Sequence, residues 1–127
     1  MSLDDYFKNC RVRVRKQKFD IVKSRKAYDR AFANIDDDEI TVIIEQGKYN
    51  AGDAIEVEKG WKILTFEAVL PMSLTGFLAK VSSELAEEKI SIFAVSAYST
   101  DHILVKEKDL EKARKRLEKI GCITYEK

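Results

Sequence analysis

Two polar stretches of this chain carry residue types that can hold a small charged molecule. Residues 73–76 (SLTG) supply two hydroxyl groups and a glycine, beside which backbone N–H groups stay open to a carboxylate. Residues 96–101 (SAYSTD) end in Asp101, whose carboxylate can pair with an ammonium group. Structural explanations stay open as well, because Ser73 can simply cap a helix, Gly76 can allow close packing and Asp101 can close a hairpin. The elements around the two stretches must decide between these alternatives.

A helix and a strand hairpin are predicted around these stretches. Apolar residues recur at the three-and-four spacing of a helix with one buried face, and Ser73 falls at the N-cap position. These residues are Leu74, Phe77, Leu78, Val81 and Leu85. Residues 90–97 are apolar on both faces of an extended chain, which predicts a strand buried on both sides. Residues 102–105 resume the strand pattern, so we expect a hairpin with Asp101 at or just past its tip.

Two further strands and a second helix complete a βαββαβ order. Residues 61–70 alternate as a strand, residues 110–120 have the apolar spacing of a helix, and residues 122–125 can form a last strand. Gly121 is placed to end the second helix in a left-handed turn. This order predicts an α+β fold over residues 60–127, a ferredoxin-like antiparallel sheet with both helices on one face.

Residues 1–59 are expected to form a shorter unit with an N-terminal extension. Residues 19–22 and 40–44 read as short strands, and residues 25–32 between them can form a helix or an irregular crossing. A turn-rich stretch places the joint between the halves within residues 47–60. The acidic run 36–39 lacks the alternate ligand spacing and bend glycine of a calcium loop, so we interpret it as a solvated turn.

Composition argues against several classes of partner. The 127 residues carry 23 basic and 22 acidic side chains, so bulk charge attracts neither nucleic acid nor a membrane surface. No apolar run approaches the ~20 residues of a membrane span, and no signal-peptide core begins the chain, so a cytoplasmic protein is expected. Cys10 and Cys122 have no metal or redox spacing and are interpreted as small buried hydrophobes. No metal or cofactor is expected.

The remaining residues carry neither a catalytic constellation nor a clear nucleic-acid signature. The single histidine, His102, has no serine or cysteine partner that the sequence places beside it, and no glycine-rich phosphate loop occurs, so we expect no enzyme. Arg11, Arg13 and Arg15 share one face of an extended segment. A solvated edge strand explains them better than an RNA-binding face, because no pair of stacking aromatic residues accompanies them.

Three segments together resemble the ACT-domain proteins of the CASTOR type, which are small tandem ACT proteins. They are Gly60–Trp61, the loop LPMSLTG at 70–76, and ISIFAVSAYSTDHILV at 90–105, where the family has a GW opening, L-D-F-S-x-x-G and ISIFAISTYDTDYILV. A fainter similarity covers DEITVII in the first half, which corresponds to a first, shorter ACT unit. Pro71, Ala97, Ser99 and His102 differ from the family pattern, so the resemblance leaves the ligand's identity open.

The resemblance implies a non-enzymatic regulatory protein that senses a small amino acid or a related metabolite. The ligand-binding residues that it implies are Ser73, Leu74, Thr75, Gly76, Ser96, Thr100 and Asp101. Phe93 and Val95 put apolar side chains on the sheet face that no helix covers, and either the first half of the chain or a second copy can cover them. The resemblance favours a homodimer. Two other functions stay open, a protein-interaction module without a ligand and an RNA-binding ferredoxin-like domain.

Overall fold

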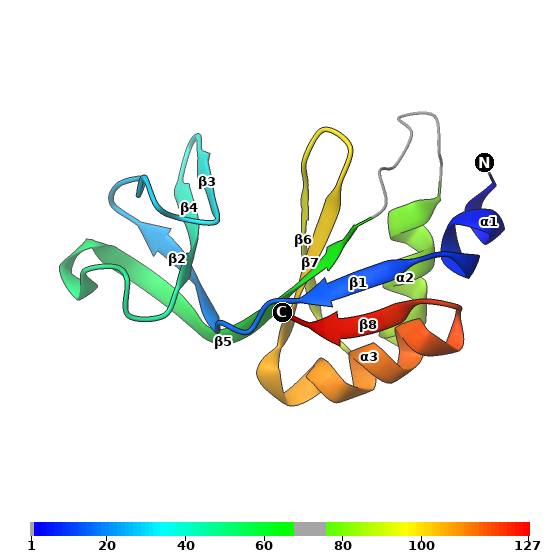
Figure 1. Ribbon diagram of the computed structural model, residues 1–127. Helices are drawn as coiled ribbons and strands as arrows, with labels where there is room; N and C mark the ends of the chain where they lie inside the picture. Colours follow the sequence, from blue (N-terminus) through cyan, green and yellow to red (C-terminus); the bar gives the residue numbers. More distant parts are fainter. Residues whose placement is uncertain (1, 68–75) are drawn as a thin grey trace. The chain divides into compact units, whose positions relative to one another are not determined.

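The computed structural model describes residues 2–67 and 76–127, and it has the mixed α+β fold expected from the sequence. The chain divides into two compact units, residues 17–61 and residues 1–16 with 62–127. Its helices and strands, labelled in Figure 1, are α1 (Leu3–Lys8), β1 (Arg11–Val14), β2 (Phe19–Ser24), β3 (Ala33–Asp36), β4 (Ile40–Glu45), β5 (Ala54–Phe66), α2 (Phe77–Glu87), β6 (Ile92–Ser96), β7 (Asp101–Lys106), α3 (Leu110–Lys119) and β8 (Ile123–Glu126). None of the helices in the described ranges is long and apolar enough to span a membrane.

The larger unit contains the predicted βαββαβ order. From the second half of β5 onward the chain runs β5, α2, β6, β7, α3, β8, and the sheet order is β6-β7-β5-β1-β8. The two helices pack on one face of this sheet through Val81 and Leu85 of α2 and Ala113 and Leu117 of α3. Gly121 has φ +116° directly after α3, so the predicted left-handed end of this helix is confirmed.

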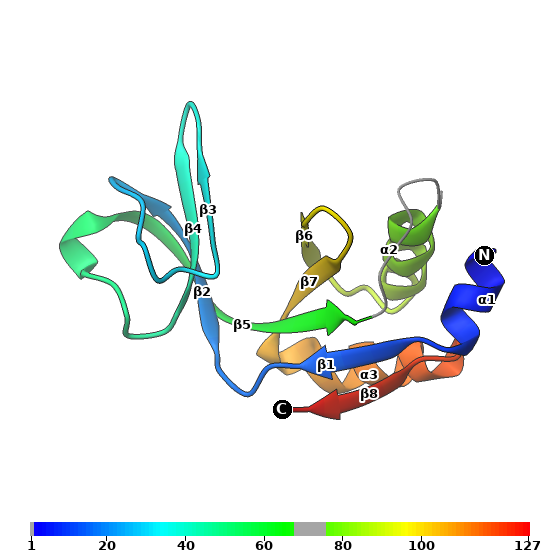
Figure 2. The ribbon, with the colours of Figure 1, turned by 45° about the horizontal axis from the view of Figure 1, so that its top comes forward.

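Strand β1 corrects the interpretation of the arginine segment as a solvated edge strand. It pairs antiparallel with β5, with Val12 opposite Phe66, and parallel with β8, with Arg11 opposite Ile123. Figure 2 shows β1 lying between these two strands. The valines between the arginines are fully buried, so the N-terminal segment is a central strand of the larger unit. The sequence of this segment alone cannot show that β5 and β8, which are distant in the chain, each have an edge with which it pairs.

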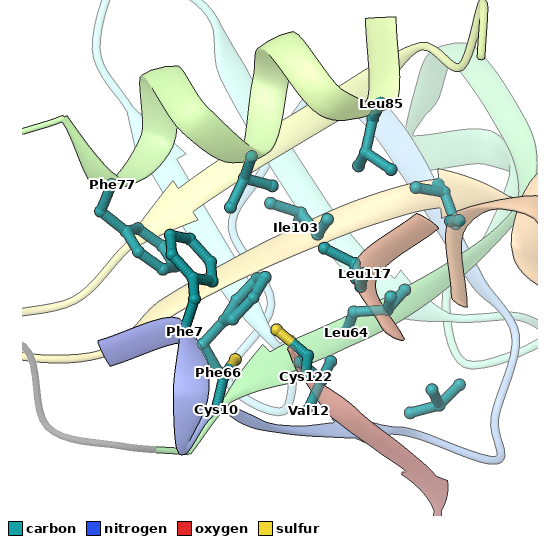
Figure 3. Packing of buried hydrophobic residues seen from close by; sticks show 14 of the residues in the cluster. Phe7, Cys10, Val12, Leu64, Phe66, Phe77, Leu85, Ile103, Leu117 and Cys122 are labelled. Atoms are coloured by element: carbon teal, nitrogen blue, oxygen red, sulfur yellow. The ribbon is translucent and has the colours of Figure 1, made fainter. Parts of the chain in front are cut away.

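An aromatic cluster anchors α1 and α2 over this sheet. Phe7 of α1 stacks on Phe77, the first residue of α2, with ring centroids 5.6 Å apart, and Phe66 meets Phe77 edge-on at 4.9 Å. Figure 3 shows these rings gathered with Val12, Leu64 and Ile103 in one core. Burying an aromatic or branched aliphatic side chain contributes about 1.5–3 kcal/mol, so the N-terminal segment is a substantial part of the core of this unit.

The two cysteines are buried, as expected, and lie next to each other at the N-terminal ends of β1 and β8. Cys10 is 1% and Cys122 4% exposed, and both thiols are free. A hydrogen bond with the Cys10 thiol, together with burial, raises the pKa of Cys122. The Cys122 thiol therefore stays protonated, and such a thiol reacts slowly with oxidants.

Strand β6 differs from the strand buried on both faces that its apolar residues predict. In the described part of the chain it pairs with β7 alone, and none of Ile92–Ser96 is buried. Its neighbour β7 instead carries the fully buried run Ile103, Leu104 and Val105. The apolar composition correctly predicted a strand. The position of β6 at the edge of the sheet leaves its side chains partly exposed.

The smaller unit, residues 17–61, is an antiparallel sheet with the order β3-β4-β2-β5. The predicted strands at 19–22 and 40–44 are confirmed as β2 and β4, and residues 25–32 form turns rather than a helix. Residues 37–39 are an exposed turn after β3, as expected. Within residues 17–61 no α-helix occurs, so the helix-containing order belongs to the larger unit. Strand β5 runs through Gly60, and the compact units divide at Trp61–Lys62.

A buried carboxylate ties the smaller unit together. Asp20 is 3% exposed and accepts hydrogen bonds from Gln46 Nε2 at 2.8 Å, the Tyr49 hydroxyl at 2.6 Å and the Gly60 N–H at 3.2 Å. Burial and this carboxylate raise the pKa of Tyr49 to about 12, so the phenol stays neutral and donates. Three segments of the unit therefore meet at one side chain.

The change Asp20→Ala is expected to destabilise the smaller unit by about 3 kcal/mol, because it leaves three donors around a buried site without an acceptor. Urea unfolding followed by circular dichroism measures the loss. Glu58→Ala, which removes an exposed carboxylate from β5 of the same unit, is the matched control and should change stability by less than about 0.5 kcal/mol. Equal effects of the two changes would contradict a structural role for Asp20.

Candidate functional site

The candidate ligand-binding residues divide between described and undescribed parts of the chain. Ser73, Leu74 and Thr75 lie outside the described residues. Gly76, Ser96, Thr100 and Asp101 are described, and all four lie at one end of the larger unit. The reason is topological: α2 begins beyond the carboxyl end of β5, and the hairpin joins the end of β6 to the start of β7 at that same end (Figure 1).

Helix α2 starts later than its apolar spacing predicts, and its cap differs. It begins at Phe77, and Gly76 rather than Ser73 occupies the N-cap position with φ +82°. The Lys80 N–H donates to the Gly76 carbonyl at 2.9 Å as the first helical bond, and no side chain among the described residues caps the helix. Within residues 2–67 and 76–127, the N–H groups of the first turn therefore present the positive end of the helix dipole without a side-chain acceptor.

Gly76 is suited to this position for a conformational reason. A side chain with Cβ rarely adopts its left-handed backbone, although an added Cβ would come no closer than 3.6 Å to Leu3 Cδ2. The backbone geometry, and not a lack of space, thus favours glycine here. Gly76 also adds no side chain of its own at the approach to the first turn of α2.

The hairpin places Asp101 where it was predicted, just past the tip. Ser96 pairs with Asp101 across the two strands, and the Ala97 N–H donates to the Thr100 carbonyl at 2.8 Å to close the turn. Thr100 and Asp101 are half-buried, whereas Ser96 is exposed. Asp101 shares a side of β7 with Ile103, which faces the helices, so its carboxylate belongs to the helix-covered face of the sheet.

Tyr6 of α1 is a polar residue at this end of the unit that the sequence did not indicate. Its ring meets Phe77 edge-on at 5.2 Å, and its hydroxyl is buried without a hydrogen-bond partner in the described part of the chain. Burial raises the pKa of Tyr6, and its neighbours Cys10, Cys122 and, last, Asp101 raise it further. Tyr6 is thus a neutral phenol with a free donor near α2 and Asp101. Its only sequence signal is its place in a Tyr–Phe pair.

His102 lies on the other face of the sheet from Asp101. Its Nδ1 is 2.9 Å from the hydroxyl of buried Thr65 on β5. Burial lowers the pKa of His102, and the charges of Arg15 and Arg13 lower it further against the opposing effect of Asp101. The imidazole is therefore neutral at physiological pH and makes a hydrogen bond across two strands. Its position separates it from the Gly76 and Asp101 end of the helix-covered face.

Metal binding finds no support in the described ranges. Among residues 2–67 and 76–127, no three His, Cys, Asp or Glu side chains are grouped to hold a metal ion. A pocket of about 290 Å³ adjoins the acidic turn and is lined in part by Asp36–Glu39. Lys23 Nζ lies 3.8 Å from Glu39 Oε2 there, and this ion pair neutralises part of the negative charge.

Solved structures with the same fold come from several bacteria. A protein from Agobacterium tumefaciens superposes with a TM-score of 0.76 at 22% identity, covering 94% of each chain. A Vibrio cholerae protein of unknown function, described as a possible transport protein, gives 0.74 at 17% identity, covering 94% of this chain and 95% of that one. Aspartate kinase from Clostridium acetobutylicum, described as an allosteric enzyme, gives 0.66 at 14% identity, and the match covers 87% of this chain but 34% of the enzyme.

Family membership follows from the sequence profile rather than from these distant structures. Residues 56–119, about half of the chain, match the family described as ACT domain. The matched range includes most of β5, the helices α2 and α3, and the β6–β7 hairpin, which are the elements that bring Gly76 and Asp101 to one end of the unit. The ACT domain is a regulatory module. This chain belongs to the ACT domain family.

Proposed function

We propose that this protein is a non-enzymatic regulator that binds a small amino acid at the end of the larger unit where α2 and β7 begin. The observation that carries the proposal is the N-terminus of α2, which no described side chain caps, at the same end of the unit as the Asp101 carboxylate. An amino acid has one group for each: its carboxylate suits the helix terminus and its ammonium suits Asp101. The resemblance to CASTOR-type tandem ACT proteins supports the same ligand class.

Tyr6 adds a third element to the proposed site. Its buried hydroxyl group can donate a hydrogen bond, and an oxygen of the ligand would accept it. The undescribed residues Ser73 and Thr75 are proposed to add hydroxyl groups, with Leu74 beside them, because they immediately precede Gly76 in the chain. Ser96 and Thr100 would border the ligand from the hairpin.

Binding is proposed to change self-association, with a homodimer as the regulated form. Strand β6 pairs only with β7 in the described part of the chain, and its apolar residues are half-exposed, so a second copy could cover them. Since Ser96 ends this strand, the proposed site lies next to the surface that would associate. A ligand can shift such an equilibrium only if it binds the two states with different affinities.

Thermal-shift and calorimetric titration against each of the twenty amino acids tests the proposal. We expect one or a few to stabilise the protein, by ~2.7 kcal/mol at a hundredfold excess over the dissociation constant. Gly76→Val should abolish the response, because it forces a side chain into the left-handed approach to α2. Asp101→Asn, which changes charge but hardly shape, should weaken binding about tenfold or more through loss of the ammonium contact.

Gly47→Val is the matched control. Gly47 has nearly the same backbone angle, φ +81°, in the smaller unit and has open space around it. It should share any cost of conformational strain but keep the amino-acid response. No response of the unmodified protein to any amino acid, or full binding by Asp101→Asn, would overturn the proposal and favour a protein-interaction module without a ligand.

A further inference from the structure

A polar pocket lies on the helical side of the larger unit, at the opposite end of α2 from the proposed amino-acid site. Its volume is about 170 Å³, and it is lined by Glu88, Lys112, Lys115, Arg116 and Lys119. Four of these five side chains are cationic. The whole chain carries a net charge of only +1, so this concentration is a local feature of α3.

Arg116 lines the pocket and is held in place by ion pairs with the end of α2. Its guanidinium bonds Glu84 at 3.3 Å, Glu88 at 3.2 Å and also Glu87, all on or next to the last turn of α2. These carboxylates raise the pKa of Arg116, foremost through the Glu84 bond, and Arg116 in turn lowers the pKa of Glu84. The arginine is therefore held in one geometry. Its Nε–H, however, is buried and has no hydrogen-bond partner in the described ranges.

Positive charge exceeds negative charge around the pocket, because Arg116 and the three lysines outnumber the three carboxylates that pair with Arg116. Lys112, Lys115 and Lys119 are exposed and recur at the spacing of one helical face. Lys112 is positioned by donating to the Glu88 carbonyl at 3.1 Å. The acidic side chains of α3 have other partners: Glu111 pairs with Arg114, and Glu118 accepts from the Thr124 hydroxyl at 2.8 Å.

Such a face is unfavourable for an isolated helix. Like charges three or four residues apart destabilise a helix by about 0.2–0.5 kcal/mol per pair, and the lysines and Arg116 form several such pairs. An anion bound among them would relieve the repulsion.

We propose that this pocket binds a phosphate group of a small molecule. A phosphate monoester carries about −1.5 to −2 charges at pH 7 and three strong acceptor oxygens. Three ammonium groups match this charge and number of acceptors better than they match a carboxylate, which has two oxygens and one charge. The site is separate from the proposed amino-acid site and does not depend on it.

Titration of the full chain with inorganic phosphate, followed by amide chemical shifts at ionic strength balanced with chloride, tests the site. We expect saturable shifts centred on α3 and the end of α2. The double change Lys115→Gln/Lys119→Gln should weaken binding about tenfold or more, since two charge-assisted contacts are lost. The matched control Lys48→Gln/Lys59→Gln removes two exposed lysines from the smaller unit and should leave the affinity unchanged.

A comparison of two ligands distinguishes the free phosphate ion from an organic phosphate ester. Glycerol phosphate binding more tightly than inorganic phosphate, on the same residues, would point to an organic phosphate ester, and equal binding would point to the free ion. Either result supports the site. Shifts that do not saturate, or that survive the Lys115/Lys119 change, would overturn it. A single-stranded oligonucleotide that binds α3 when inorganic phosphate does not would also overturn it, in favour of a nucleic-acid surface. The amino-acid response is measured independently, so each proposal can fail alone.

Discussion

Removal of residues 2–16 is expected to unfold the larger unit. The truncation deletes a strand that is hydrogen-bonded on both sides, to β5 and to β8. It also removes five nearly fully buried side chains, among them Tyr6, Phe7, Val12 and Val14. At about 1.5–3 kcal/mol each, their burial is comparable to the whole stability of about 5–15 kcal/mol that a domain possesses. Circular dichroism and urea unfolding should show loss of the cooperative transition of this unit.

A point substitution separates the role of β1 from the general effect of shortening the chain. Val12→Asp places a carboxylate in the core between β5 and β8 and should also unfold the unit. Arg11→Asp changes the neighbouring, exposed residue of the same strand and should be tolerated within about 1 kcal/mol, which includes the loss of its ion pair with Glu67. Wild-type-like unfolding of the truncated chain would show that β1 is an accessory strand rather than a central one.

Gly121→Ala is expected to cost about 3 kcal/mol or more, because strain and a clash coincide. The residue has φ +116°, and an added Cβ would lie 2.5 Å from the carbonyl oxygen of Phe7 and 3.2 Å from its carbonyl carbon. Both are backbone atoms, so relief requires α1 to move. Chemical unfolding measures the loss.

The glycine in the smaller unit again provides the comparison. Gly47 also has a left-handed backbone, but an added Cβ meets nothing within 4 Å, so Gly47→Ala should cost only about 1 kcal/mol. The difference between the two substitutions isolates the contact with α1. A similar cost for both would show that Phe7 does not lie against Gly121 in solution.

The same substitution links stability to the proposed site. Phe7 stacks on Phe77, and Tyr6 precedes it in the chain, so moving α1 would displace the free hydroxyl near Asp101 and the start of α2. A Gly121→Ala protein that still folds should therefore bind the amino acid less tightly. The lysines of the α3 pocket should keep their affinity for phosphate, because none of the residues lining that pocket belongs to α1.

Local patterns predicted most of the elements that surround the candidate site. The alternation of 40–44, the spacing of 110–120 and the glycine at 121 each depend on a few neighbouring residues, and each prediction is confirmed. The hairpin before β7 was equally readable, because polar residues interrupt two apolar runs. The start of α2 was predicted too early. Leu74 continues its apolar spacing, but the helix begins only beyond the left-handed Gly76.

The sequence alone determined the order of elements in the ACT unit and the residue types at the end where α2 and β7 begin. Periodicity and turn chemistry are local properties, so they can be read from neighbouring residues. Tertiary structure alone decided three further features: β1 as a central strand, Tyr6 beside Phe77, and the exposure of β6. Each depends on pairing between segments far apart in the chain. Strand propensity says that a segment extends, but the free edges of other strands decide where it pairs, and that placement sets which polar groups are buried without partners.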